Sequence, residues 1–188
     1  MERPQTADNL LKSRLKGPAM NALVVYESAW GNTRSVAEAI GEGLAEHAAV
    51  AVVPAHEASP LADIQVDLLV VGAPTHAFGL PREGTREDAQ RRGGEPAASG
   101  VREWLDACES ISLMVTAFDT HVRHPDLPGH AGKKIAKKLK RLGGRGAADP
   151  ESFYVDGYEG PLLPGELDRA REWGAQLMQG RGASNPQG

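Results

Sequence analysis

Hydroxyl and amide side chains gather around one glycine, directly after a short apolar run at residues 22–26. The residues of this segment are Ser28, Ala29, Trp30, Gly31, Asn32 and Thr33. A helical pattern starts at Thr33, and a loop that enters a helix presents unpaired N–H groups at the positive end of the helix dipole. These residue types in this order indicate a phosphate site. The alternative is that Asn32 or Ser28 only caps the helix.

Three other phosphate chemistries do not fit this loop. A Walker loop ends in Gly-Lys-Ser/Thr, and a dinucleotide fingerprint reads G-x-G-x-x-G, and neither pattern occurs here. A phosphoacceptor domain of a response regulator needs an acidic pair after its first strand and an aspartate at the end of its third. Only Glu27 stands at the first place, and Gly72, Ala73 and Pro74 occupy the second.

Polar and aromatic residues also follow two later apolar runs. After residues 66–71 come Pro74, Thr75, His76, Ala77, Phe78 and Gly79, and residues 111–117 lead to Phe118, Asp119, Thr120 and His121. His76 and Phe78 could form an apolar wall for a planar ligand, although a proline-rich turn with a solvated His76 is the alternative. Phe118 could equally belong to the hydrophobic core.

Strand and helix patterns alternate along most of the chain. Short apolar runs predict strands at 22–26, 50–53, 66–71, 111–117 and 153–155, and apolar residues at helical spacing predict helices at 33–46, 101–107, 133–142 and 166–178. Such alternation gives a parallel sheet covered by helices on both faces. Ligands of these sheets bind outside the carboxyl ends of the strands, where the strand order reverses. The three polar loops are therefore expected to meet at one edge.

The segment from Tyr26 to Thr33 resembles the phosphate loop of the flavodoxin family, which typically runs Ser/Thr-x-Thr-Gly-Asn-Thr. Ser28, Gly31, Asn32 and Thr33 match that loop, whereas Trp30 stands where many members carry a hydroxyl residue. The Gly-x-Pro-Thr pattern ending at Thr75, followed by a bulky residue, is similar to the family's ring-binding loop. The resemblance covers roughly residues 20–178. It implies a flavodoxin-like three-layer α/β sandwich with a five-stranded parallel sheet in the order 2-1-3-4-5.

The same resemblance implies FMN as the cofactor. Residues 28–33 would hold its phosphate, residues 74–79 and 118–121 would flank its ring, and Asp119 and Thr120 would bond its pyrimidine edge. The implied function is electron transfer through the flavin to redox partner proteins or a small-molecule acceptor. Two alternatives stay open. One is an FMN-dependent oxidoreductase using NAD(P)H and a quinone-like acceptor, with His76, His121 or His130 assisting proton transfer. The other is a flavin-free binding module on the same fold.

Composition excludes several classes of protein function. The chain has 188 residues and a net charge of −4, which argues against a dedicated nucleic-acid binder. No apolar run is long enough to span a membrane, and no secretory signal is recognisable, so a cytoplasmic location is expected. The single cysteine, Cys108, forms no internal disulfide and fits a core position at a helix end. No Cys/His spacing suggests zinc.

Residues 20–179 are expected to form one domain, between a disordered extension at 1–19 and a disordered tail at 180–188. Met20 could itself be the natural start. The basic stretch from Lys133 to Arg145 is interpreted as a solvated helix face, with a docking patch as the alternative. The charged insertion at 81–100 is expected to be either a lid or partner contact, or a flexible surface excursion.

Overall fold

The computed structural model describes residues 20–76, 79–97, 99–124 and 128–179. Within these residues, all the named strands belong to one parallel sheet. The strands are β1 (Asn21–Tyr26), β2 (Ala49–Pro54), β3 (Leu68–Pro74), β4 (Met114–Val122), β5 (Arg145–Gly146) and β6 (Glu151–Val155). All residues of β3 are buried, as expected of a central strand with helices on both faces. The termini at 1–19 and 180–188 lie outside the described residues, as do 77–78, 98 and 125–127.

The strand order is β2-β1-β3-β4-β5, and β6 also pairs with β4. The expected order 2-1-3-4-5 is confirmed, with a sixth strand added. β5 pairs with residues 114–115 of β4 and β6 pairs with residues 118–122, while β3 occupies the opposite edge. The strand expected at 153–155 is β6, and β5 is an additional two-residue strand along the same edge of β4.

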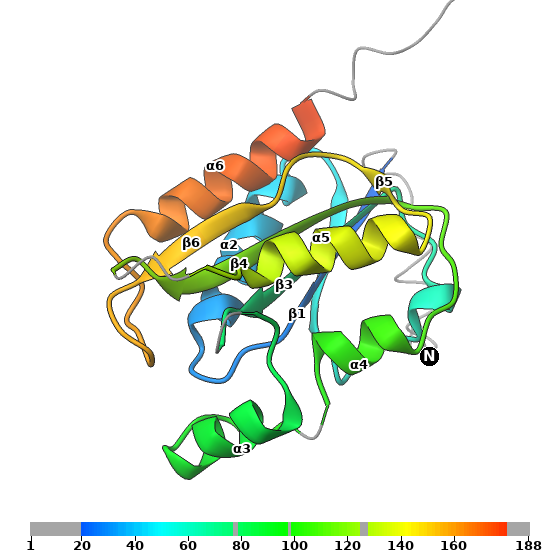
Figure 1. Ribbon diagram of the computed structural model, residues 1–188. Helices are drawn as coiled ribbons and strands as arrows, with labels where there is room; N and C mark the ends of the chain where they lie inside the picture. Colours follow the sequence, from blue (N-terminus) through cyan, green and yellow to red (C-terminus); the bar gives the residue numbers. More distant parts are fainter. Residues whose placement is uncertain (1–19, 77–78, 98, 125–127, 180–188) are drawn as a thin grey trace, which may run out of the picture.

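Helices cover both faces of the sheet and complete the three layers (Figure 1). α2 (Asn32–Ala45) and α6 (Glu166–Gln179) pack in one apolar cluster, and α4 (Val101–Asp106) and α5 (Ala131–Arg141) pack in the other. Leu61 of a short 3-10 turn, η2 (Leu61–Asp63), packs in the same cluster as α4 and α5. Cys108 is buried in that cluster, as expected for a core residue. No helix in these described segments is long and apolar enough to cross a membrane.

Two glycines let α2 and α6 cross in backbone contact. A Cβ atom at Gly43 would collide with the carbonyl oxygen of Arg171, and one at Gly174 would collide with the carbonyl oxygen of Ile40. Both glycines are buried, and neither backbone position has a positive φ. Only glycine fits at these two positions because the helices lie so close together, and not because the backbone has an unusual conformation.

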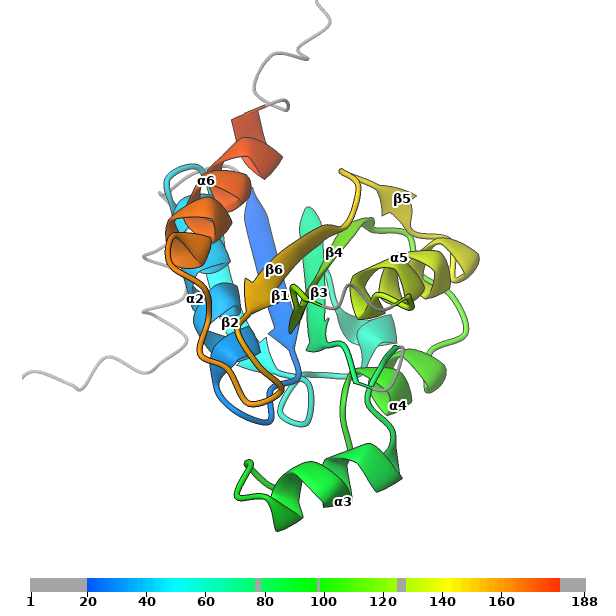
Figure 2. The same ribbon diagram turned by 60° about the vertical axis from the view of Figure 1, so that its left-hand side comes forward.

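The charged insertion contains a helix, α3 (Glu83–Arg91), that projects from the body of the sheet (Figures 1 and 2). This part of 81–100 is therefore a helical excursion from the surface. α3 has no apolar stripe, since its buried residues are Arg86 and Ala89. Its first turn is fixed by Thr85, whose hydroxyl accepts from the Arg82 amide at 2.8 Å and donates to the Arg82 carbonyl at 2.9 Å.

One further boundary differs from the sequence prediction, and one interpretation of the sequence agrees with the structure. β4 runs to Val122, so residues 118–121 belong to the strand itself and not to the loop after it. Along α5, Lys133, Lys137 and Lys140 are solvent-exposed, which agrees with a solvated helix face.

Candidate functional site

The first turn of α2 is left without a side-chain cap. Its N-cap is Gly31 in the left-handed region, with φ +84°, and Ser28 Oγ accepts from the Gly31 amide at 3.1 Å. The Asn32 side chain does not cap the helix, because its Nδ2 donates to the carbonyl of Glu159 at 2.9 Å. The amides of Asn32 and Thr33 find no acceptor among the described residues. The capping alternative is therefore not what the structure shows, and this helix start is open to an anion.

A narrow crevice lies beside this helix start, at the carboxyl ends of β1, β3 and β4. The buried hydroxyls of Thr33 and Thr120 lie 2.7 Å apart and join α2 to β4 across it. Thr75 continues the wall, since its amide donates to the carbonyl of Thr120 at 2.8 Å. The crevice is lined by Ser28, Ala29, Trp30, Asn32, Thr33, Pro74, Thr75, His76, Thr120, His121, Val122, Val155 and Tyr158.

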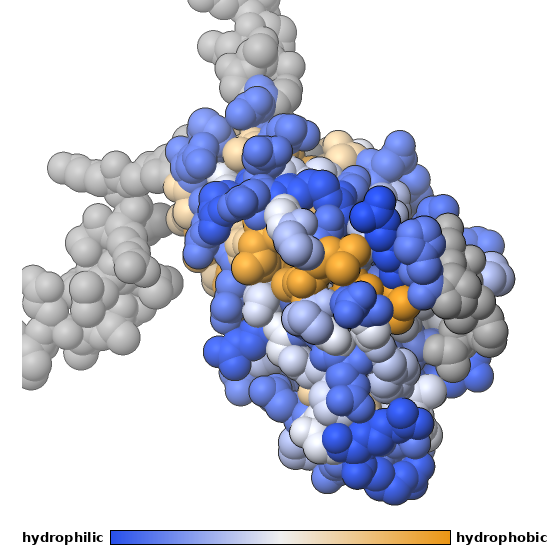
Figure 3. Space-filling view, turned by 90° about the vertical axis from the view of Figure 1, so that its left-hand side faces the viewer, coloured by the Kyte–Doolittle hydropathy of each residue, from blue (hydrophilic) through white to orange (hydrophobic). Residues whose placement is uncertain are grey.

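The crevice brings together most of the site residues expected from the sequence, and leaves out a few. Gly31 and Gly79 do not line it, and Ala77 and Phe78 lie outside the described residues. Gly79 instead exchanges two backbone hydrogen bonds with His76. Figure 3 shows the molecule from the side toward which β4 and β6 point in Figure 1. On this side, a hydrophobic area of the surface is surrounded by hydrophilic residues.

His76 is buried in the wall of the crevice, with 4% of its surface exposed. Its ring stacks on Tyr158 with 5.2 Å between centroids and 27° between planes. Its Nδ1 is buried and has no hydrogen-bond partner within the described part of the chain. Burial, and secondarily the positive charge of Arg86, lower the pKa of His76 to about 4. The solvated-turn alternative is therefore wrong, and His76 is neutral at neutral pH.

This lowered pKa makes stability depend on pH in a defined window. The unfolded chain takes up a proton at His76 near pH 6.5, whereas the folded protein does so only near a pKa of about 4. The contribution of His76 to the free energy of unfolding should therefore fall by up to about 3 kcal/mol as the pH drops through this window, and stay constant above it. Urea unfolding of wild type and His76→Asn at several pH values checks this, because the variant should lose this part of the pH dependence. An identical pH dependence in both proteins would contradict it.

Phe118 and Asp119 do not line the crevice. Phe118 is fully buried, lies directly against Gly72, and meets Phe153 edge-on at 6.2 Å, so the core alternative holds for this residue. Asp119 is also fully buried, and its Oδ2 accepts from the Gly132 amide at 2.8 Å. The carboxylate expected to bond a ligand therefore holds the start of α5 instead.

Asp119, His121 and His130 offer ligand atoms within 4.8 Å of one another, a cluster that the sequence did not predict. The Asp119 carboxylate is engaged on both oxygens, because Oδ1 lies 3.1 Å from Nδ1 of His121 and Oδ2 accepts from α5. The two imidazole rings meet edge-on at 4.5 Å. We interpret the cluster as a hydrogen-bonded support for the strand end rather than as a metal centre.

A buried ion pair fixes the base of the first loop. Glu27 and Arg86 are each 7% exposed, and Arg86 Nε donates to Glu27 Oε1 at 2.7 Å. The other Glu27 oxygen accepts from the Val101 amide at 2.9 Å, and Arg86 also reaches Glu103. The network ties α3 and the start of α4 to the end of β1. The sequence contained one signal for this network, because Glu27 directly follows a buried strand. A carboxylate that is buried there needs a partner.

Tyr158 covers the crevice, and sequence reasoning missed it. Besides its stacking on His76, its ring meets Trp30 edge-on at 6.4 Å and lies 5.4 Å from the guanidinium of Arg92. The hydrogen bond from Asn32 to Glu159 holds the neighbouring backbone on α2. The space left in the crevice is about 30 Å³, which holds no more than about one or two waters.

Comparison with known proteins decides the family. The family model described as flavodoxin matches residues 24–175. The chain belongs to the flavodoxin family. No curated protein sequence matches it.

Solved structures agree with this flavodoxin fold at low sequence identity. A flavodoxin from the domain Archaea is 18% identical, with a TM-score of 0.58, over 86% of this chain and 98% of that one. Oxidised Flavodoxin 1 from Bacillus cereus is 16% identical, with a TM-score of 0.62, over 84% and 96%. The Flv1 flavodiiron core from Synechocystis is 19% identical, with a TM-score of 0.56, over 92% of this chain and 39% of that one. These similarities show the fold.

Membership of the flavodoxin family implies a flavin cofactor, so the crevice can be tested for fit. The phosphate end fits, because the free amides of Asn32 and Thr33 and the hydroxyls of Ser28 and Thr33 lie there. Trp30 replaces a hydroxyl residue, yet its buried indole Nε1–H is a donor without an acceptor among the residues described. The ring end fits only after Tyr158 leaves its stacking position on His76, because about 30 Å³ cannot hold a flavin.

Proposed function

We propose that this flavodoxin-family chain binds FMN through its phosphate and transfers electrons through the flavin. The observation that carries the proposal is the uncapped start of α2, where Gly31 has a positive φ and the next two amides lack acceptors. Such a helix start favours a dianion electrostatically and by direct hydrogen bonds. Its place at the carboxyl ends of β1 and β3 is where the sheet order reverses.

The residues around the crevice have separate roles in this proposal. Ser28, Asn32 and Thr33 would donate to the phosphate, and the neutral imidazole of His76 would lie against the ring. The bound flavin would accept and return electrons, while the protein sets its position and surroundings. Redox partner proteins or a small-molecule acceptor would exchange electrons at the ring edge.

The direct test is a comparison of two ligands that differ only in the phosphate. Purified protein is titrated with FMN and with riboflavin, and quenching of flavin fluorescence is followed. FMN should bind at least about a hundredfold more tightly, because two or more charge-assisted hydrogen bonds are made only with the phosphate. Failure of FMN to bind at about 1 mM would reject the proposal.

The contact between Tyr158 and His76 favours a second candidate, a flavin-free binding module on the same fold. In that case the stacked pair is the permanent filling of the ring site, as the small residual space suggests. The same titration separates the two candidates. A flavin-free module would bind neither FMN nor riboflavin, and its purified form would carry no yellow chromophore.

Removing the Tyr158 ring should open the site and raise flavin affinity. In the Tyr158→Ala variant, the stacking on His76 and the cation–π contact with Arg92 are lost, which together stabilise the closed form by about 1–2 kcal/mol. FMN and riboflavin should therefore both bind about five- to thirtyfold more tightly, as measured by the same titration. Weaker binding of both ligands would instead place Tyr158 in the wall around the bound ring.

A further inference from the structure

The loop before α2 contains a buried hydrogen-bond donor that the described part of the chain does not use. Asn32 Nδ2 donates to the carbonyl of Glu159 at 2.9 Å. The hydroxyl of Thr33 shares a hydrogen bond with that of Thr120 at 2.7 Å. The indole Nε1–H of Trp30 is buried as well, but no described residue accepts from it. A buried N–H without an acceptor costs free energy, so a ligand that supplies the acceptor is favoured.

Trp30 stands next to the open start of α2. It directly precedes Gly31, the N-cap residue with a positive φ, and the amides of Asn32 and Thr33 find no acceptor among the residues described. Trp30, Asn32 and Thr33 all line the crevice. The ring of Trp30 also meets Tyr158 edge-on at 6.4 Å, so the indole contacts the residue that covers the crevice. Three N–H groups without acceptors therefore belong to neighbouring residues of one wall.

These N–H groups define the chemistry of a ligand. Backbone and indole N–H groups donate hydrogen bonds and accept none. A hydroxyl residue, which many members of the family carry in place of Trp30, can donate or accept. The tryptophan therefore restricts this position to ligand atoms that accept. The oxygens of a phosphate dianion are such atoms, and their charge strengthens each hydrogen bond that they accept.

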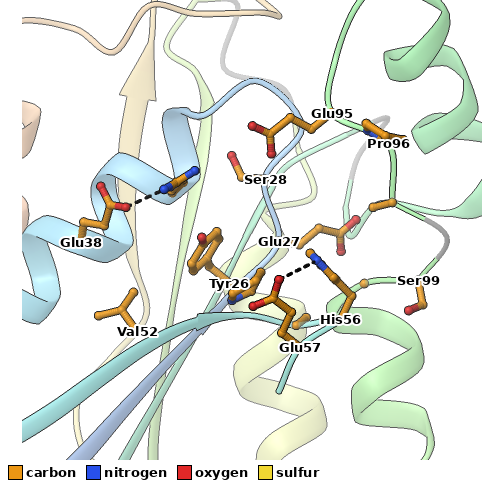
Figure 4. A pocket seen from close by; sticks show the side chains of 15 residues that line it. Tyr26, Glu27, Ser28, Glu38, Val52, His56, Glu57, Glu95, Pro96 and Ser99 are labelled. Carbon is orange, nitrogen blue, oxygen red and sulfur yellow. Dashed lines mark hydrogen bonds and ion pairs between the residues drawn. The ribbon is translucent and has the colours of Figure 1, made fainter. Parts of the chain in front are cut away.

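A second cavity next to this loop is unsuited to an anion. Ser28 lines both this cavity and the crevice, whereas Trp30 lines the crevice alone. Three carboxylates line the second cavity, and its one guanidinium is paired with one of them. The carboxylates belong to Glu38, Glu57 and Glu95 (Figure 4). Because these carboxylates repel an anion, a phosphate held by the loop is expected in the crevice, on the side of Trp30.

We propose that Trp30 is a phosphate-binding residue, whose indole Nε1–H donates a hydrogen bond to a phosphate oxygen of the ligand. This inference rests on the proposed function, since FMN supplies the phosphate. The indole adds one charge-assisted hydrogen bond to those from the start of α2. It thereby takes the place of the hydroxyl residue that many members of the family carry.

The first test uses inorganic phosphate and needs no flavin. Phosphate is titrated into full-length, flavin-free protein, and the indole N–H signals of the three tryptophans are followed by NMR. The Trp30 signal, identified by its absence in variants of this residue, should move downfield as its hydrogen bond forms. The Trp104 signal should stay in place, because that indole already donates to the carbonyl of Ser59 at 2.9 Å.

The second test compares FMN with riboflavin in variants of Trp30. Trp30→Phe keeps an aromatic ring in the crevice but removes the N–H. Its affinity for FMN should fall about ten- to a hundredfold, the range for one charge-assisted hydrogen bond, while its affinity for riboflavin should stay the same. Trp30→Thr should recover much of the FMN-to-riboflavin affinity ratio, because a hydroxyl can donate in place of the indole.

Trp173→Phe is the matched control, since Trp173 packs against the core cluster of α2 and α6 and does not line the crevice. Its affinity ratio should equal that of the wild type. An unchanged ratio in Trp30→Phe would overturn the inference, and so would a Trp30 signal that phosphate does not move. Either result would leave the proposed function intact if the wild type binds FMN more tightly than riboflavin. A wild type that binds no FMN would reject the proposed function and this inference together.

Discussion

Replacing Asn32 and Thr33 together by alanine is expected to weaken FMN binding about a hundredfold or more. Both side chains line the crevice at the start of α2. Each would donate one charge-assisted hydrogen bond to the phosphate, worth about 1.5–3 kcal/mol. The Asn32 side chain must first leave the carbonyl of Glu159, so part of its contribution is offset. Titration of flavin fluorescence with the double variant measures the net loss.

Riboflavin provides the internal control for this double variant. It lacks the phosphate, so its affinity should stay the same or rise slightly when the tether to Glu159 is removed. A parallel loss for both ligands would indicate a distorted crevice rather than lost phosphate contacts. Unchanged FMN affinity would contradict the assignment of the phosphate to this helix start.

Replacing Arg86 by methionine is expected to destabilise the protein by about 3–5 kcal/mol. Methionine keeps much of the side-chain volume, but it leaves the Glu27 carboxylate buried without a cation. The Val101 amide would still donate to Glu27, which is one hydrogen bond for a full negative charge. Equilibrium unfolding in urea measures the loss of stability.

Two further variants separate the buried charge from the other effects of the substitution. Glu27→Gln combined with Arg86→Met removes both charges and should recover much of the lost stability. Arg92→Met removes an exposed cation from the end of α3 and should change stability by less than about 1 kcal/mol. If Arg86→Met cost no more than Arg92→Met, the ion pair would have no structural role. Loss of Arg86 should also raise the pKa of His76, which its charge now lowers.

The sheet and the phosphate loop could be predicted because their signals are local. Continuous apolar runs indicate the buried strands β1 and β3. The alternation of such runs with amphipathic helices indicates that the strands of the sheet are parallel. The loop residues 28–33 carry their own pattern of hydroxyl, glycine and amide groups. These features need no knowledge of distant contacts.

The parts that were missed depend on contacts between distant segments. α3 is polar on every side and is held by the salt bridge of Arg86 with Glu27, 59 positions away. β4 continues through Asp119 because α5 covers that carboxylate with an amide. Tyr158 lies in a stretch rich in glycine and acidic residues that reads as an ordinary turn, and only the folded chain shows that it contacts His76.

The crossing of α2 and α6 has a consequence for the site. The helix that begins at the phosphate loop and the helix that follows the Tyr158 segment touch through backbone atoms at Gly43 and Gly174, with no side chain between them. Interdigitated side chains can change rotamer and so accommodate a displacement of one helix against the other. Two main chains in direct contact cannot adjust in this way. The two helices are thereby held at a fixed spacing, so we expect entry of a ligand to draw on motion of the 156–161 segment between β6 and α6 rather than on separation of these helices.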